Sequence, residues 1–264
     1  MRLISYVEGH VPERLADACV RGPVVDGTPD AVLLRLPRVG RFLVRADVPA
    51  AVERAPGATD ADIECFIRGP VAAAAALLRG ALPLHAAAVS IGGRAIAIAG
   101  ISGSGKSAVA AAMALRGHAV LADAVTVVDG LVRPIAPKPV LWPDMVEELG
   151  LDPSHGEVVR PALAKRAFQL GPRPEAAPLQ TVVILLSDPA RTRAASAPLS
   201  GWRKTSALLS ACWYRRVVGP MGLEPRRFQS IAALAPQVDV IHVVRPRDHC
   251  SPVALAALVE EALA

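Results

Sequence analysis

Apolar and polar positions in the first quarter of the chain predict short strands joined by turns. Apolar runs at 32–36 and 41–45 flank turn residues at 37–40, which is typical of a β-hairpin. Val24 and Val25, just before an Asp-Gly pair, predict another short strand. We therefore expect a small β-rich N-terminal module over 1–68, followed by a larger domain over 69–264.

After residue 69 the pattern mixes strand-like and helix-like periods. The longest branched apolar run, 179–186, has the length and composition of a central buried strand. Residues 187–201 have no apolar period and predict a loop. Together these segments predict an α/β fold with a mixed sheet, hairpins and flanking helices. Residues 126–132, with Asp129-Gly130 at the turn, predict a second hairpin. Further strands are expected at 82–91, 95–99, 119–123, 140–142, 166–170 and 238–244, and helices at 70–79, 106–116, 143–149, 203–217, 224–235 and 253–263.

Composition supports a globular protein and narrows its partners. Hydrophobic residues make up 52% of the 264 residues and charged residues 20%, so a sizeable core is expected. The net charge of +5 suits a polyanionic ligand such as ATP but is too small for a nucleic-acid footprint. No zinc-finger spacing or long basic run is present. We expect no nucleic-acid partner.

Cysteine usage and the terminal segment point to the cytoplasm. The four cysteines have no CxxC spacing and are expected to be reduced thiols. The first ten residues lack the apolar segment of a signal peptide, and the alanine-rich run at 71–78 is too short to span a bilayer. A cytoplasmic protein with no membrane partner is the expectation.

One motif carries specific chemistry: Gly100-Ile-Ser-Gly-Ser-Gly-Lys106-Ser107 matches GxxxxGK[ST] between an expected strand and an expected helix. The glycines allow the backbone to turn its N–H groups toward phosphates at a helix N-terminus. Lys106 is then expected to reach the β- and γ-phosphates, and the Ser107 hydroxyl to bind Mg²⁺. The predicted cofactors are ATP and Mg²⁺, and the predicted nucleotide-binding residues are Gly100, Ser102, Gly103, Ser104, Gly105, Lys106, Ser107 and Ala108.

Two further residues are candidates for catalysis. Asp123 ends the strand that follows the phosphate-loop helix, so we expect it near the phosphates, placed to accept a hydroxyl proton or to orient Mg²⁺. His85 lies in the apolar strand before the loop. For His85, a satisfied core residue and an active-site residue are both open interpretations.

The chain from Leu84-His85-Ala-Ala-Ala-Val through the phosphate loop to Arg116-Gly-His118 and Asp123 resembles the C-terminal domain of bacterial HPr kinase/phosphorylase. It is also similar to HPr-kinase-like proteins associated with lasso-peptide biosynthesis. The resemblance implies that Asp123 takes the proton of an acceptor serine and that His85 supports this carboxylate. It implies that Lys106 stabilises the transferring phosphoryl group and that Ser107 and Asp123 hold Mg²⁺. The implied acceptor is a peptide or small protein, and a homo-oligomer is expected.

The chain departs from that family at two points. Asp123 is followed by Ala124, where the family typically has a second aspartate. The family's LEIRG-type segment, which supplies a metal-binding glutamate, has no counterpart; Asp129, Asp144 and Glu147 are the nearest alternatives. A serine kinase is the leading interpretation. The alternatives are a nucleotide-binding regulatory protein that has lost phosphotransfer and a true HPr kinase/phosphorylase. An ordinary NTP-hydrolysing protein is not supported, because the sequence has no apolar strand that ends in Asp-Glu, the Walker B pattern.

Overall fold

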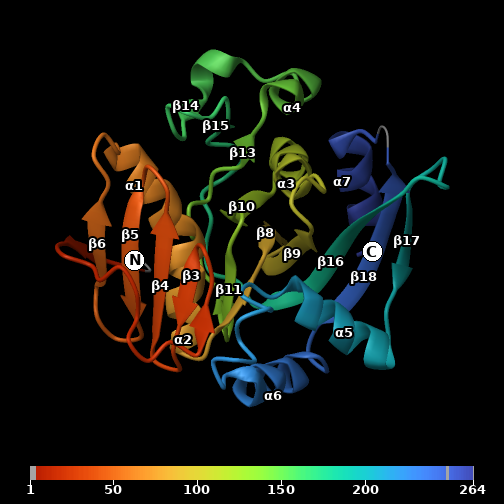
Figure 1. The fold of residues 1–264 in the computed structure, drawn as a ribbon. Coiled ribbons are helices and arrows are strands. Elements are labelled where there is room, and N and C mark those ends of the chain that lie inside the picture. Colours follow the sequence, from red (N-terminus) through yellow and green to blue (C-terminus); the bar gives the residue numbers. More distant parts are fainter. Residues whose placement is uncertain (1–3, 248–249, 264) are drawn as a thin grey trace.

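The computed structural model describes residues 4–247 and 250–263. Within that part of the chain, the N-terminal region forms a six-stranded sheet in the order β1-β6-β5-β4-β3-β2 (Figure 1). β1 runs parallel to β6, and the other neighbours are antiparallel. The strands are β1 Tyr6–Glu8, β2 Val20–Arg21, β3 Val25–Gly27, β4 Ala31–Leu36, β5 Gly40–Arg45 and β6 Ala50–Arg54.

The β-rich prediction for this region is confirmed, with one addition. β4 and β5 form the expected hairpin, with Leu36 opposite Gly40 next to the turn. Helix α1 (Asp60–Phe66) was not expected. Its start is fixed by a capping box, in which the Thr59 side chain accepts from the Asp62 N–H and the Asp62 carboxylate accepts from the Thr59 N–H.

A helical stretch joins this sheet to the rest of the molecule. α1 continues through a π-helical segment (Ile67–Val71), kinked at Gly69, into α2 (Ala72–Leu78). All seven residues of α2 are buried. Ala72 and Leu78 pack with the N-terminal sheet, whereas Ala73 packs with the second sheet. The expected boundary between 68 and 69 therefore falls inside a helical stretch that belongs to both cores.

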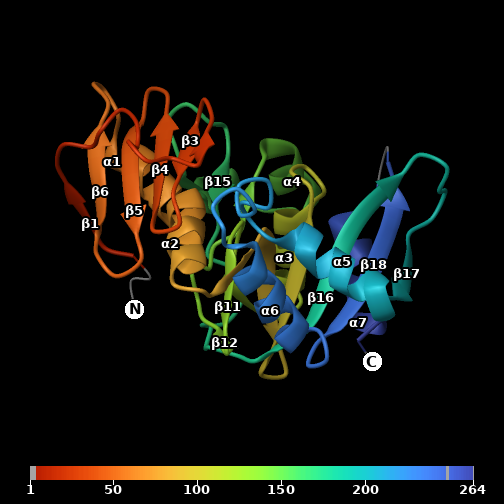
Figure 2. The same cartoon turned by 60° about the horizontal axis from the view of Figure 1, so that its bottom comes forward.

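The second large sheet is mixed, as the predicted fold class requires. Its order within the described chain is β10-β8-β9-β16-β18-β17, and Figure 2 shows β16, β18 and β17 side by side. β9, β16 and β18 are parallel, and the remaining pairs are antiparallel. β16 covers the run expected as a central strand. The strands are β8 Ala86–Ile91, β9 Arg94–Gly100, β10 Ala119–Ala122, β16 Leu179–Asp188, β17 Ala195–Pro198 and β18 Asp239–Pro246.

Helices cover both faces of this sheet, so the domain has three layers. Along β9 the alternation is regular: Ala97 and Ala99 face one core, and Ile96 and Ile98 face the other. The first core includes α5 and α6, and the second includes α3 and α7. Their bounds are α3 Lys106–Leu115, α5 Gly201–Ala211, α6 Glu224–Leu234 and α7 Pro252–Glu261.

Two small sheets flank the end of β9. One has the order β12-β11-β7 and contains the expected Asp-Gly hairpin; the other has the order β13-β15-β14. In Figure 1 the second small sheet and α4 lie above α3. The elements are β7 Leu82–Leu84, β11 Thr126–Asp129, β12 Leu131–Val132, β13 Val140–Leu141, α4 Pro143–Glu148, a 3₁₀ turn at Pro153–His155, β14 Glu157–Val158 and β15 Arg166–Ala167.

Three sequence expectations need correction. The single strand expected over 82–91 breaks at His85, because the His85 N–H donates to Ala211 O (2.7 Å) instead of continuing a ladder. The helix expected over 203–217 ends at Ala211, where Cys212 turns extended and bridges Leu84. The loop expected over 187–201 contains β17, which pairs with β18.

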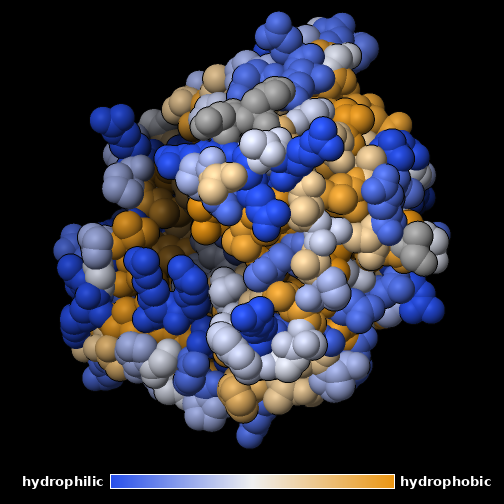
Figure 3. All heavy atoms as spheres, turned by 90° about the vertical axis from the view of Figure 1, so that its right-hand side faces the viewer, coloured by the Kyte–Doolittle hydropathy of each residue, from blue (hydrophilic) through white to orange (hydrophobic). Residues whose placement is uncertain are grey.

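The side of the molecule that carries β17 and α7 is shown in Figure 3. Hydrophilic residues cover much of it, hydrophobic residues lie between them, and the face is hollowed. Across residues 4–247 and 250–263, no helix is long and apolar enough to cross a membrane.

Candidate functional site

The phosphate loop has the backbone that its sequence predicts. It connects the end of β9 to α3, and Gly103 and Gly105 have φ values of +81° and +100°. A Cβ at Gly100 would lie 2.6 Å from Ser104 Oγ and 2.8 Å from Leu185 O, so a side chain is excluded there. A Cβ at Gly103 or Gly105 would meet nothing within 4 Å. The loop is thus closely packed at Gly100 and open at Gly103 and Gly105, as a loop that binds phosphates through its backbone must be.

Lys106 lies folded over this loop. Its Nζ donates to Gly100 O (3.0 Å) and Ile101 O (2.9 Å), and the residue is only 7% exposed. Burial lowers the pKa of the Lys106 ammonium, and the nearby Asp123 carboxylate acts in the opposite direction. Among the described residues, the hydrogen-bond partners of the ammonium are backbone carbonyls, which leaves its charge available to an anion.

Ser107 and Asp123 meet behind the loop. Ser107 Oγ donates to Asp123 Oδ1 at 2.8 Å. The same oxygen accepts from the Ala124 N–H (3.0 Å), and Oδ2 accepts from the Val140 N–H (2.8 Å). Burial raises the pKa of the Asp123 carboxyl, while these hydrogen bonds lower it. Asp123 therefore fixes the orientation of the Ser107 hydroxyl beside the loop.

A cavity lies above the phosphate loop, and Ala124, the residue after Asp123, lines it. Asp123 does not line the cavity, whereas Ala124 does and is exposed. Ala124 has φ +69°, a left-handed conformation that alanine rarely adopts. Its carbonyl accepts a hydrogen bond from Trp213 Nε1 at 3.1 Å. The missing second carboxylate noted in the sequence would therefore have faced the cavity.

His85 lines the same cavity from the strand side. Its ring packs edge-on against Trp213 with 4.9 Å between centroids. Burial, reinforced by the Lys106 charge, lowers the pKa of His85 to about 4, so the ring is neutral at physiological pH. Within the described residues no hydrogen bond joins His85 to Asp123. The expected role of His85 in supporting that carboxylate stays a prediction.

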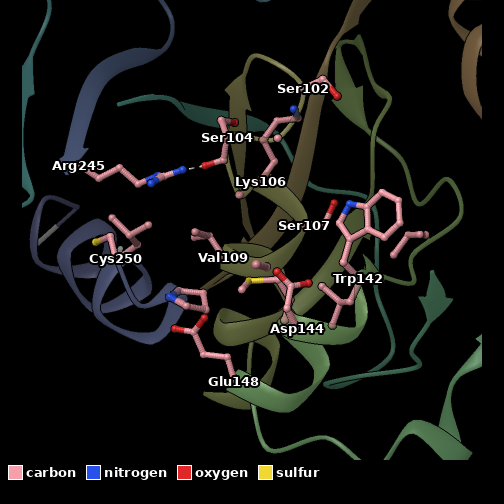
Figure 4. Close-up of a pocket in the computed structure, with 18 of the residues that line it drawn as sticks. Ser102, Ser104, Lys106, Ser107, Val109, Trp142, Asp144, Glu148, Arg245 and Cys250 are labelled. Atoms are coloured by element: carbon pink, nitrogen blue, oxygen red, sulfur yellow. Dashed lines mark hydrogen bonds between the residues drawn. The ribbon is translucent and has the colours of Figure 1, made fainter. Parts of the chain in front are cut away.

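The cavity above the loop has a volume of about 430 Å³. Its opposite wall is α4, which contributes Asp144 on the side of Ser107 and Glu148 on the side of α7 (Figure 4). Of the three carboxylates considered as alternatives, Asp144 lines the cavity, whereas Asp129 and Glu147 do not. The remaining lining residues that the sequence did not single out for this site are Val109, Val140, Leu141, Trp142, Met145, Glu148, Lys165, Arg245, Arg247, Cys250, Pro252 and Leu255.

Arg245 contributes a second cation at the loop. It lies near the end of β18, and its Nε donates to Ser104 O at 3.4 Å (Figure 4). Its Nη1 donates to Pro246 O (2.9 Å) and Arg247 O (3.3 Å). In the part of the chain described, all partners of Arg245 are backbone carbonyls. Within the described residues neither Arg245 nor Lys106 forms an ion pair with a carboxylate.

These residues fit a triphosphate and a divalent cation. The loop is an open backbone cradle beside Lys106 and Arg245, two cations that form no ion pair in the part of the chain that the structure describes. Ser104 Oγ is buried without a hydrogen-bond partner, so a polar group is available within the loop. Ser107 Oγ, oriented by Asp123, is the hydroxyl suited to Mg²⁺.

Some of the missed residues had a signal in the sequence. Glu148 follows Asp144 by four positions, which places both on one face of a helix. Arg245 ends a strand parallel to β9, and the carboxyl ends of parallel strands share one edge of a sheet. The sequence pattern did not indicate Lys165, because this residue lies in an irregular segment. Tertiary contacts place its Nζ 4.6 Å from the centre of the Trp142 ring.

No family model and no curated protein matches the sequence. Among solved structures, the chain is similar to the HPr(Ser) kinase/phosphatase from Coxiella burnetii, with 14% sequence identity and a TM-score of 0.31. The match covers 69% of this chain and 95% of that one. At this distance the function of the chain has to be argued from its own residues.

Proposed function

We propose that this protein is a kinase that binds ATP with Mg²⁺ and transfers the γ-phosphate to a hydroxyl group, a serine of a peptide or small protein. The single observation that carries the proposal is the joining of the phosphate loop to Asp123 through Ser107, at the wall of a cavity of about 430 Å³. A cavity of this size accommodates a nucleotide.

The residues divide the work of binding and positioning. The loop amides and Lys106 hold the phosphates, and Arg245 adds positive charge at the other side of the loop. Mg²⁺, held through Ser107, supplies neutralisation of the phosphate charge when it is bound. Phosphoryl transfer asks mainly for such positioning and charge stabilisation, so this set of residues is suited to it.

Proton removal from the acceptor falls to Asp123 in this proposal. Burial raises the pKa of its carboxyl, which makes it a stronger base than an exposed aspartate. Its two oxygens accept three hydrogen bonds, from Ser107, Ala124 and Val140. Oδ2 accepts only one of the three, so a lone pair remains on this oxygen for the proton of a serine.

A specific observation favours a second candidate, a nucleotide-binding protein without transfer. The cavity-facing position after Asp123 holds Ala124, which has no proton-accepting group. Because Asp123 is buried and does not line the cavity, nucleotide binding would proceed while proton removal would be slow.

The deciding experiment is a phosphotransfer assay. The protein is incubated with ATP, Mg²⁺ and a serine-centred peptide library, and products are analysed by mass spectrometry for the gain of one phosphate. Lys106→Met is the inactive control. Transfer by the wild type, increased by Ala124→Asp, supports the kinase. Tight ATP binding with no transfer by either protein overturns the kinase and supports the second candidate.

A further inference from the structure

The cavity extends to both sides of the phosphate loop. Asp123 follows β10, and Arg245 is in β18; in the sheet order β10-β8-β9-β16-β18 these strands flank β9, which carries the loop. The metal-binding end of a bound polyphosphate belongs with Ser107 and Asp123. Its other end, which carries the nucleoside, therefore extends toward the Arg245 side.

Beside Arg245 and Arg247, the cavity has a group of apolar side chains. Met145 from α4, Pro252 and Leu255 from α7, and Val109 from α3 line it together with Cys250. Figure 4 places Cys250 beside the start of α7 and Val109 between it and α4. An apolar wall with few polar groups is the usual environment of a nucleobase.

One carboxylate belongs to this wall. Glu148 is in the last turn of α4, and Figure 4 shows its side chain on the side of α7, apart from Ser107 and Trp142. Glu148, Arg245 and Cys250 all line this cavity. Within residues 4–247 and 250–263, the Glu148 carboxylate has no hydrogen bond or ion pair.

An ionised carboxylate only accepts hydrogen bonds. Glu148 is half-buried beside apolar side chains, so a ligand N–H group that donates to its carboxylate stabilises the complex. We infer that the Arg245 side of the cavity is a nucleobase site, in which Glu148 accepts a hydrogen bond from a base N–H group such as the exocyclic amine of adenine. This rests on the proposed nucleotide binding and adds how the base is recognised.

The test compares two ligands that differ in this one group. ADP carries the exocyclic amine; purine riboside 5′-diphosphate has hydrogen in its place and no N–H on its base. We expect the wild type with Mg²⁺ to bind ADP about tenfold more tightly in isothermal titration calorimetry, as for a hydrogen bond to a charged group. In Glu148→Met the ADP affinity falls to that of the analogue, and the analogue affinity is unchanged.

Glu147→Met is the matched control, because Glu147 is the adjacent residue of α4, is exposed and does not line the cavity. It should keep the full preference for ADP. Equal binding of the two ligands to the wild type, or an ADP preference that survives in Glu148→Met, overturns the role of Glu148 and leaves the proposed kinase standing. Binding of neither ligand overturns the nucleotide site itself, and the proposed function with it.

Discussion

Ser107 Oγ and Asp123 Oδ1 are 2.8 Å apart, and their hydrogen bond joins the first turn of α3 to the residue that follows β10. Each residue alone has ordinary structural explanations: a serine in a helix turn and an aspartate at a strand end. Their contact behind a glycine-rich loop is specific, because it combines a hydroxyl suited to Mg²⁺ with a buried carboxylate that orients it.

The first prediction concerns this pair. Asp123→Asn keeps the size of the side chain but removes its charge, so Mg²⁺ is held less well. We expect the affinity for ATP with Mg²⁺ to fall about tenfold or more, as when a group that orients a metal ligand is lost. Binding of ATP in EDTA should not weaken, because the substitution removes a negative charge and no phosphate contact is lost. Calorimetric titrations with Mg²⁺ and with EDTA measure both.

Asp129→Asn serves as the control, since Asp129 is an exposed residue next to the β11–β12 turn. It should leave both affinities unchanged. An equal loss of ATP affinity with and without Mg²⁺ in Asp123→Asn would show that Asp123 supports the loop and has no particular effect on the metal.

The second prediction concerns the backbone at Ala124. At φ +69° an alanine is strained by about 1 kcal/mol, and glycine is not. Ala124→Gly should therefore raise the free energy of unfolding by about 0.5 kcal/mol, since glycine's greater freedom in the unfolded chain offsets part of the gain. Ala124→Asp should fold as stably as the wild type, because aspartate tolerates this conformation better. Urea denaturation of the three proteins measures this, and a destabilising Ala124→Gly would contradict it.

The third prediction concerns pH and His85. Its pKa is lowered to about 4 in the folded protein from about 6.5 in an unfolded chain. The unfolded state therefore binds the proton more readily, so the contribution of neutral His85 is present above pH 6.5 and is lost as the pH falls toward 4. The wild type should lose stability between pH 7 and 4.5 more steeply than His85→Gln. Parallel slopes in urea denaturation at several pH values would contradict the prediction.

How far local sequence predicts this molecule depends on where the determining contacts lie. The phosphate loop, the strand at 179–186 and the hairpins were predictable, because glycine geometry and apolar alternation act within a few residues. The break at His85 was not, because it depends on the carbonyl of Ala211, far along the chain. β17 was missed because an edge strand of Ala-Ser-Ala-Pro has no apolar period.

The site shows the same division. The side chains of the loop were predicted one by one, and Asp123 was placed near them by its position after a strand. The local sequence does not show that Asp123 is buried behind Ser107 while Ala124 lines the cavity. That depends on the three hydrogen bonds that hold the carboxylate, one of which comes from Val140, seventeen residues later.

The fourth prediction concerns the contact between the N-terminal region and the cavity wall. Arg160, between β14 and β15, donates to Asp62 Oδ1 at 2.7 Å and lies 5.0 Å from the centre of the Phe66 ring. Hydrogen bonding to Thr59 and then to Arg160 lowers the pKa of Asp62 to about 2. We expect Arg160→Ala to reduce the free energy of unfolding by about 1–3 kcal/mol, because it leaves a largely buried carboxylate without its cation.

Arg68→Ala is the matched control for this pair. Arg68 pairs with Glu64 one helical turn away, but both side chains are well exposed, so the loss should be about 0.5 kcal/mol or less. If the two variants lose equal stability in urea denaturation, Arg160 is not a significant link between the two regions.

The central claim is that the loop from Gly100 to Ser107 holds a nucleoside triphosphate, and titration of ATP with Mg²⁺ into the protein tests it most directly. We predict saturable binding of one ATP per chain in calorimetry. Lys106→Met, which removes the ammonium held over the loop, should weaken it at least tenfold. No binding at millimolar ATP, or binding of equal strength in wild type and Lys106→Met, would contradict the claim.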